Sequence, residues 1–226
     1  MVRRAAAQVK PAASIVSAAP PHRNSPAPRS GGSHFTFHIS RFTALMKLVI
    51  LDRDGVINHD RDDFVKSAAE WVPIDGSLEA IARLNHAGWR VVVATNQSGI
   101  GRGLFGMAEL NAMHDKLHRL LAGVGGRVDA IFLCPHTADM QCGCRKPKPG
   151  MYRDIGLRFD ARLDETPVIG DSLRDLEAAA AVGAQPILVR SGKGEKTLAK
   201  GGLPAGTRVY ADLSEAVDAL IDAGED

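Results

Sequence analysis

Two aspartates one residue apart, Asp52 and Asp54, follow a hydrophobic run over residues 47–51. The run has no polar residue after its first, which is typical of a strand buried on both faces of a parallel sheet. Groups just past the end of such a strand face the crevice where ligands gather. Side chains two residues apart in an extended segment point the same way, so both carboxylates are predicted to share one site. Like charges that close need a cation, and Mg²⁺ is the usual partner of carboxylate oxygens.

A cluster of hydroxyl and amide groups ends a second hydrophobic run. It consists of Thr95, Asn96, Gln97 and Ser98, and glycines follow at positions 99, 101 and 103. Such a loop can present backbone N–H groups and a hydroxyl to phosphate oxygens. The alternative interpretation is an ordinary polar turn.

Further acidic and basic groups follow the later runs. Asp171 and Ser172 end the fourth predicted strand, and Asp175 lies one helical turn further on. An acid here can contribute to a site or cap the following helix. Arg145 and Lys146 occupy a turn that two prolines stiffen. A guanidinium fork and a compact ammonium charge suit a phosphoryl group in transit, whereas the alternative is a solvated turn.

All three cysteines of the chain lie within eleven residues. Cys134, His136, Cys142 and Cys144 offer three thiolates and one imidazole, which matches a closed tetrahedral structural zinc site. A disulfide and free buried thiols are the alternatives, and an odd number of cysteines makes the disulfide less favourable. With no open coordination position, Zn²⁺ would shape the loop rather than take part in chemistry.

Two histidines, His114 and His118, are spaced i, i+4 on a predicted helix. That spacing suits a metal, but no acid or thiol accompanies them, so we expect them on an exposed face.

Hydrophobic periodicity predicts alternating strands and helices along the chain. The strands are expected at residues 47–51, 90–95, 129–133, 166–170, 186–190 and 208–210, and the helices within 76–88, 107–121, 150–159, 173–183 and 213–223. This alternation predicts an α/β protein with a doubly wound parallel sheet. The polar clusters would then meet beyond the carboxyl ends of its strands.

Composition divides the 226 residues into two parts. Residues 1–45 hold six basic residues, five prolines and no acid, whereas residues 46–226 carry a net charge of −4. A segment of this composition cannot repay its ordering entropy, so we expect a disordered leader before a single domain over 46–226. The leader resembles a transit peptide and, faintly, a secretory signal. Because Met46 directly precedes the first strand, we favour translation from Met46. No stretch approaches the ~18 apolar residues of a membrane span, so no membrane partner is expected.

Four of these features together resemble the haloacid dehalogenase superfamily of phosphatases, over about residues 46–190: Asp52-x-Asp54-Gly55, Thr95, Lys146 and Gly170-Asp171. The resemblance implies a capless Rossmann-like fold. It also implies that Asp52 is a nucleophile that forms an aspartyl-phosphate and that Asp54 is the general acid and base. Thr95 and Lys146 would stabilise the phosphoryl group. Mg²⁺ would be held by the carboxylates of Asp52 and Asp171 and by the Asp54 backbone carbonyl.

A narrower resemblance comes from the zinc loop before Arg145-Lys146-Pro147, together with residues 52–58 and 95–100. These segments resemble the branch that contains heptose 1,7-bisphosphate 7-phosphatases and histidinol-phosphate phosphatases. The first group is the more similar and implies a cytoplasmic enzyme that removes the 7-phosphate of a sugar bisphosphate, for ADP-heptose and lipopolysaccharide core biosynthesis. The implied substrate contacts are Asp60, Arg61, Asp62, Asp63, Asn96, Gln97, Ser98, Arg145 and Ser172.

Several alternatives remain open at this stage. The five residues between His136 and Cys142 resemble the histidinol-phosphate branch, and some heptose enzymes have a lysine where this chain has Ser172. A polynucleotide 3′-phosphatase is similar around residues 95–100, but a core of net charge −4 lacks the basic stripe that nucleic acids need. A receiver-like phospho-acceptor would not need Asp54. We expect a monomer, because a capless core with a small substrate needs no partner to close its site.

Overall fold

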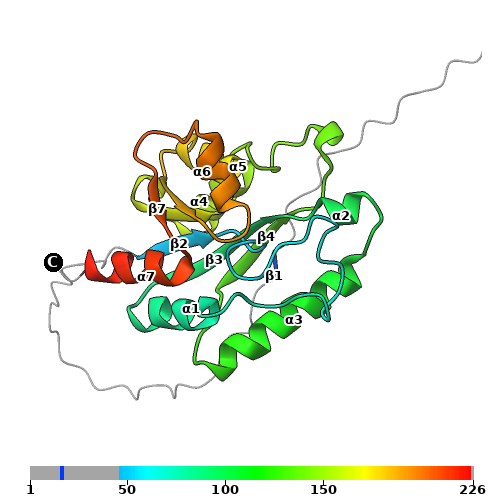
Figure 1. Cartoon of the computed structure of the whole chain (residues 1–226), viewed down its shortest axis with the longest axis horizontal. Helices are drawn as coiled ribbons and strands as arrows, with labels where there is room; N and C mark the ends of the chain where they lie inside the picture. The colour runs from blue at the N-terminus through cyan, green and yellow to red at the C-terminus, as the bar shows by residue number, and fades with distance from the viewer. Residues whose placement is uncertain (1–15, 18–45, 225–226) are drawn as a thin grey trace, which may run out of the picture.

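The computed structural model describes residues 16–17 and 46–224. A seven-stranded sheet runs through its centre in the order β1-β4-β3-β2-β5-β6-β7 (Figure 1). All neighbours from β4 to β7 pair in parallel, which confirms the predicted doubly wound parallel sheet. These strands are β2 (Leu48–Leu51), β3 (Arg90–Asn96), β4 (Ala130–Cys134), β5 (Pro167–Gly170), β6 (Gln185–Val189) and β7 (Arg208–Tyr210).

A short strand was not expected from the sequence. β1 (Val16–Ser17) pairs antiparallel with β4 at the edge of the sheet. Two residues are too few for any hydrophobic period to be visible. The rest of the predicted leader lies outside the described residues.

Helices cover both faces of the sheet. One layer consists of α1 (Ser77–His86), α3 (Met107–Gly123) and α7 (Leu213–Asp222), and the other includes α4 (Gly150–Phe159) and α5 (Leu173–Ala180) (Figure 1). Two further helices, α2 (Ser98–Gly101) and α6 (Gly194–Lys200), are too short for periodicity to reveal them. Among the described residues, no helix has the length and apolar character needed to cross a membrane.

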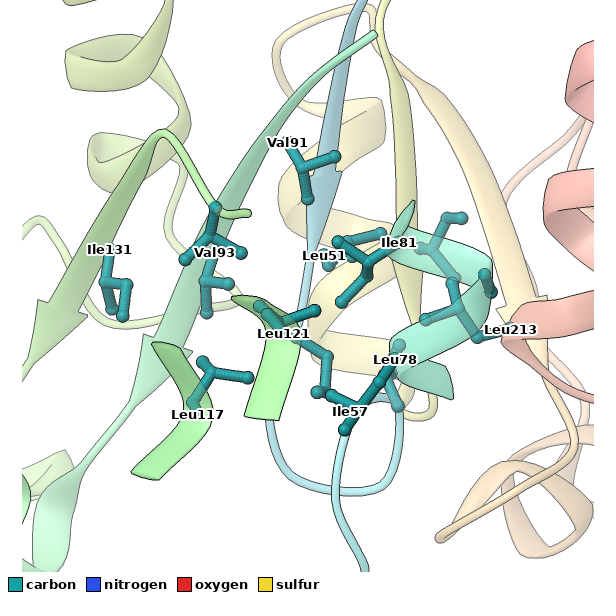
Figure 2. Close-up of a cluster of buried hydrophobic side chains, with 14 of the residues drawn as sticks. Leu51, Ile57, Leu78, Ile81, Val91, Val93, Leu117, Leu121, Ile131 and Leu213 are labelled. Atoms are coloured by element: carbon teal, nitrogen blue, oxygen red, sulfur yellow. The ribbon is translucent and has the colours of Figure 1, made fainter. Parts of the chain in front are cut away.

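The core follows from the alternation of side chains along the buried strands. Figure 2 shows Leu51 and Val93 on the sheet facing Ile81 of α1, Leu117 of α3 and Leu213 of α7. The intervening residues of the same strands face α4 and α5, and they include Leu48, Ile50, Val92 and Ala94. Because both faces are apolar, the only places where these strands can offer polar groups are their ends.

The expectation for His114 was wrong, because its side chain is buried on α3. Leu110, Met113, His114 and Leu117 occupy positions i, i+3, i+4 and i+7 of the helix, which is the width of a full core-facing stripe. Desolvation by burial and the nearby charge of Arg53 lower the pKa of His114 to about 3, so the imidazole is neutral.

Candidate active site

The end of β2 forms a tight turn that presents two carboxylates. The Asp52 backbone N–H donates to the Ile169 carbonyl at 2.9 Å, which ties the residue to β5. The backbone N–H groups of Ile57 and Asn58 then donate to the Arg53 carbonyl at 2.8 and 3.1 Å and close the turn. As a result Asp52 and Asp54 line the same cavity, which has a volume of about 230 Å³.

Gly55 lets this turn approach the end of β5. Its φ is +86°, and a Cβ atom built on it would lie 2.1 Å from Oδ2 of Asp171. Only glycine therefore allows the β2 and β5 ends to bring their aspartates together.

We expect Gly55→Ala to destabilise the fold by about 3 kcal/mol, because left-handed strain and overpacking add. Turnover should fall as well, since Asp171 must move. Gly103→Ala is the matched control: its φ is +69°, but nothing lies within 4 Å of its Cβ position. It should lose only about 1–2 kcal/mol and keep its activity. Urea unfolding and initial rates measure both, and equal behaviour of the two variants would refute the contact argument.

Lys146 is buried, with 1% of its surface exposed, and it contacts Asp52, which lines the cavity. Its Nζ donates to the Ala94 carbonyl at 2.7 Å and lies 3.1 Å from Asp52 Oδ1 and 2.5 Å from Asp175 Oδ1. Burial alone would lower the pKa of Lys146, but the charges of Asp175 and Asp52 raise it above its ordinary value. The lysine is therefore a fixed positive charge beside Asp52.

Asp175 was not predicted as a site residue. Ser172 is the N-cap of α5, and its backbone N–H donates to Asp175 Oδ2 at 3.2 Å, so the capping interpretation was sound. The same carboxylate also holds Lys146. Sequence alone shows the capping pattern but not which lysine comes within reach.

The end of β3 connects the phosphate-binding candidates. Gln97 Nε2 donates to both Thr95 Oγ1 and Asp54 Oδ2 at 2.8 Å. Asn96 exchanges two hydrogen bonds of 3.1 Å with the backbone of Lys146. The amide of Asn96 thus fixes the turn that carries Lys146 against the end of β3. Thr95, the preceding residue of the strand, is buried.

The acidic centre fits a metal ion. Asp52, Asp171 and Asp175 each place a carboxylate oxygen within 4.8 Å of the others. Desolvation, followed by the charges of Asp52 and Asp175, raises the pKa of Asp171 to about 7. Desolvation also raises the pKa of Asp52 to about 6, although Lys146 opposes it. Oδ1 of Asp171 is buried and has no hydrogen-bond partner within the described residues. Lys146 and Arg174 place two positive charges near these three carboxylates, so a divalent cation would complete the charge balance.

The predicted Cys and His ligands come together in the loop after β4. The thiol sulfurs of Cys134, Cys142 and Cys144 and Nδ1 of His136 lie 3.4–3.6 Å apart wherever they pair. These separations exceed an S–S bond, and the three cysteines are free, so no disulfide forms. Ligands about 2.0–2.3 Å from one central ion would be separated by similar distances. The cluster could therefore hold a metal.

Five cations line the cavity beside the carboxylates of Asp52, Asp54, Asp60 and Asp62: Arg61, Arg102, Arg145, Arg174 and Lys193. Arg102, Arg174 and Lys193 were missed by the sequence reasoning, because nothing local distinguishes them from other surface cations of an α/β protein. Lys193 Nζ lies 2.5 Å from Asp60 Oδ2 and joins the loop after β6 to the loop after β2.

The predicted substrate contacts divide into two groups. Those that line the cavity are Asp60, Arg61, Asp62, Asn96, Gln97, Ser98 and Arg145. Two others are not among the lining residues. Asp63 is exposed and pairs with Arg61 and Lys66, and the Ser172 hydroxyl is bound to Asp175 and to Nε of Arg174.

Two family profiles match the chain. The polynucleotide kinase 3 phosphatase profile covers residues 47–173, and the HAD-hydrolase-like profile covers residues 143–216. The first spans β2 to the start of α5 and thus includes the ends of β2, β3, β4 and β5.

Relatives of known name match over their full length. A D-glycero-beta-D-manno-heptose-1,7-bisphosphate 7-phosphatase of Bordetella bronchiseptica is 62% identical over 176 residues, which cover 78% of this chain and 98% of that protein. The enzyme of the same name from Pseudomonas putida is 56% identical over 78% of this chain and 100% of its own. A crystal structure of the D,D-heptose 1,7-bisphosphate phosphatase from B. bronchiseptica, complexed with magnesium and phosphate, superposes with a TM-score of 0.78 over 79% of this chain and 99% of that one.

The fold, the acidic centre and these matches define a phosphoric monoester hydrolase of the haloacid dehalogenase superfamily. Within that superfamily, the chain belongs to the family of the D-glycero-beta-D-manno-heptose-1,7-bisphosphate 7-phosphatases.

Proposed function

We propose that this chain removes the 7-phosphate of D-glycero-β-D-manno-heptose 1,7-bisphosphate by way of an aspartyl-phosphate on Asp52. The observation that carries the proposal is the contact of the buried Lys146 with Asp52, a carboxylate that lines a cavity to which five cations also belong. Five relatives named for the β-anomer are 55–62% identical to this chain, and another, from Photorhabdus laumondii, is 36% identical over 181 residues. The α-anomer enzymes of Mycobacterium tuberculosis are 40% identical over 140 residues. The five more similar relatives support the β-anomer.

In the first step, a carboxylate oxygen of Asp52 attacks the phosphorus and the bond to the sugar oxygen breaks. Asp54 gives its proton to that leaving oxygen. Lys146 offsets the negative charge of the phosphoryl group in transit, and the Thr95 hydroxyl donates to one of its oxygens.

In the second step, Asp54 takes a proton from water and the water oxygen attacks the phosphorus. The bond to Asp52 breaks and inorganic phosphate leaves. Asp54 is protonated again and ready for the next substrate, so the same group serves both half-reactions.

Mg²⁺ would be held by the carboxylates of Asp52 and Asp171 and the Asp54 backbone carbonyl, and it would neutralise phosphoryl charge. The unpartnered Oδ1 of Asp171 and the raised pKa values of Asp52 and Asp171 support this assignment.

The Cys and His cluster would hold a structural Zn²⁺ whose role is to position Arg145 and Lys146, which directly follow Cys144. We expect Cys144→Ser to lose bound zinc and to lower kcat/KM by roughly 10²-fold, because small displacements of a phosphate-binding group have effects of that size. Metal analysis and initial rates test this. Met140→Ala, an exposed change in the same loop, should keep both zinc and activity. A zinc-free Cys144→Ser enzyme with normal kinetics and stability would contradict the proposal that Zn²⁺ positions Arg145 and Lys146.

The second phosphate of the substrate would lie against the cations that line the cavity. Arg174 donates through Nε to Ser172, and no carboxylate pairs with its guanidinium among the described residues. We expect Arg174→Gln to raise KM for the bisphosphate by about 10–100-fold, because a charge-assisted hydrogen bond contributes about 1.5–3 kcal/mol. KM for heptose 7-phosphate, which lacks the 1-phosphate, should change little, and so should the kinetics of Arg158→Gln on the outer side of α4. An equal rise of KM on both substrates would contradict this placement.

The test of the function itself is turnover on both anomers of heptose 1,7-bisphosphate, histidinol phosphate and a 3′-phosphorylated oligonucleotide, with and without Mg²⁺. We expect the β-anomer to give the highest kcat/KM. Histidinol phosphate has one phosphate, so it would leave without a partner the cations that we assign to a second phosphate, of which Arg174 is one. A preference for histidinol phosphate or for the oligonucleotide would overturn the proposal. A cytoplasmic location, a monomeric state and a place in ADP-heptose biosynthesis belong to the same proposal and depend on its outcome.

A further inference from the structure

Arg53, the residue between the two aspartates, is a completely buried cation. Two nitrogens of its guanidinium make three contacts with the Asp54 carboxylate: Nη2 lies 2.9 Å from Oδ1 and 3.0 Å from Oδ2, and Nε lies 3.2 Å from Oδ1. Asp54 is its only carboxylate partner within residues 46–224. The side chain of Asp54 remains one-fifth exposed on the cavity side.

Stability does not explain this ion pair. Desolvating a guanidinium is costly, and replacing a buried pair by apolar residues of similar volume is often neutral or stabilising. Arg53 also leaves Nη1 buried without a hydrogen-bond partner among the described atoms, which adds to the cost. Because the buried arginine is costly to stability, we look for its function at its partner, the Asp54 carboxylate.

The geometry indicates that the role is orientation. Asn58 Nδ2 donates to Oδ1 of Asp54 at 2.9 Å, and Gln97 Nε2 donates to Oδ2 at 2.8 Å. Each amide thus touches one oxygen, whereas the guanidinium touches both and defines the plane of the carboxylate. The Oδ2 atom lies on the side of Thr95, because Gln97 bridges the two.

No other group competes for the guanidinium. His114 is the buried neighbour whose pKa the charge of Arg53 helps to lower, and its Nε2 has no hydrogen-bond partner within the described chain. A neutral imidazole does not draw Arg53 away from Asp54. Burial raises the pKa of Asp54, but the charge of Arg53 and the hydrogen bonds from Asn58 and Gln97 hold it below its ordinary value, so this geometry is that of the ionised carboxylate, the form that takes a proton from water.

We propose that Arg53 is a positioning residue, which holds the Asp54 carboxylate so that Oδ2 gives a proton to the leaving oxygen and later takes one from water. The inference rests on the roles proposed above for Asp52 and Asp54. In the first step the P–O bond to the leaving group breaks as the Asp52 oxygen bonds to phosphorus, and Asp54 supplies the proton. In the second step water supplies that proton back, and the Asp52–phosphorus bond breaks.

Leaving groups of different basicity test the proposal, because only a basic alkoxide needs a proton as it leaves. The two substrates are the sugar phosphate ester that the wild-type enzyme turns over best and p-nitrophenyl phosphate. For Arg53→Met we expect kcat/KM to fall about 10²-fold on the sugar phosphate and only a few-fold on the aryl phosphate, since general acids contribute 10²–10⁴-fold. Arg53→Lys keeps the positive charge but loses the two-pronged guanidinium. It should also lose more kcat/KM on the sugar phosphate than on the aryl phosphate, but by a smaller factor. Aspartyl-phosphate should accumulate during turnover of the aryl ester, because its hydrolysis still needs Asp54.

Two controls separate positioning from a structural role. Arg53→Met added to Asp54→Asn should cause no further loss, because the first change acts through the second residue. Arg83→Met removes an arginine that pairs with Asp218 between α1 and α7, and it should leave both substrates unaffected. If Arg53→Met does not fold, judged by circular dichroism, Arg53→Lys decides the question. Equal losses on both esters, or additive losses in the double variant, would overturn the proposal. If the heptose assignment is wrong, the wild-type enzyme will prefer another substrate. The difference between the losses of kcat/KM on the sugar phosphate and on the aryl phosphate in Arg53→Met would be unaffected.

Discussion

Asp52→Asn is expected to abolish turnover, by roughly 10⁴-fold or more, because an amide cannot form the aspartyl-phosphate. The fold should survive, since asparagine has nearly the same volume and its amide oxygen still accepts the Arg53 backbone N–H, which lies 2.7 Å from Asp52 Oδ1. Initial rates on the heptose bisphosphate and acid-quench trapping of phosphoenzyme measure the effect. Neither product nor phosphoenzyme should form.

Asp54→Asn, compared with Asp52→Asn, separates acid and base catalysis from formation of the aspartyl-phosphate. It should slow turnover by about 10²–10⁴-fold, the range that general acid and base catalysis contributes. Phosphoenzyme should still form from an aryl ester. Asp115→Asn, an exposed change on α3, is the matched control and should keep full activity. Retained turnover in Asp52→Asn would falsify the covalent mechanism, whatever the substrate.

Lys146→Met should damage both stability and activity. Lys146 is the shared partner of Asp52 and Asp175, and its removal leaves two buried carboxylates without their cation. Breaking a buried pair of this kind costs about 3–5 kcal/mol. The pKa values of Asp52 and Asp175 should both rise, so part of the nucleophile becomes protonated, and phosphoryl transfer should fall below detection. Urea unfolding and single-turnover rates check the two effects separately.

A second change distinguishes the two effects of Lys146. Lys146→Met combined with Asp175→Asn removes one of the unpaired charges and should regain part of the stability, but none of the activity. Lys148→Met, two residues on, removes an exposed ammonium that donates to the Gln141 carbonyl at 2.9 Å, and it should change neither property. Recovery of activity in the double variant would show that Lys146 acts on the fold rather than on the phosphoryl group.

Much of the architecture could be predicted because the strands are buried on both faces. Continuous apolar runs such as residues 48–51 and 91–94 leave little doubt about strand identity, and alternation with helices then implies a parallel sheet. The helices over 107–123 and 150–159 follow from their apolar stripes. Elements of two to seven residues, namely β1, α2 and α6, were missed because they span at most two repeats of the helix or strand period, too few for a pattern to stand out.

His114 illustrates the limit of periodicity on a helix. Leucine and methionine alone define the apolar stripe expected on α3, and that stripe does not include His114. The structure buries this residue, and Arg53, from the turn after β2, is near enough to lower the pKa of its imidazole. The partner of a polar side chain that comes from another element cannot be inferred from local spacing.

The sequence by itself determined which chemistry this protein can do. Two acids one residue apart, a hydroxyl and a further aspartate each end a hydrophobic run, a lysine lies in a turn between two such runs, and four thiol and imidazole ligands lie within eleven residues. Those features depend on local spacing, which a chain carries before it folds. Only the tertiary structure decided that Asp175 holds Lys146, that Arg174 and Lys193 join the cavity wall, and that Arg53 turns inward to Asp54. These contacts depend on how separate strand ends and loops meet at one edge of the sheet, and no pattern along the chain encodes such distances.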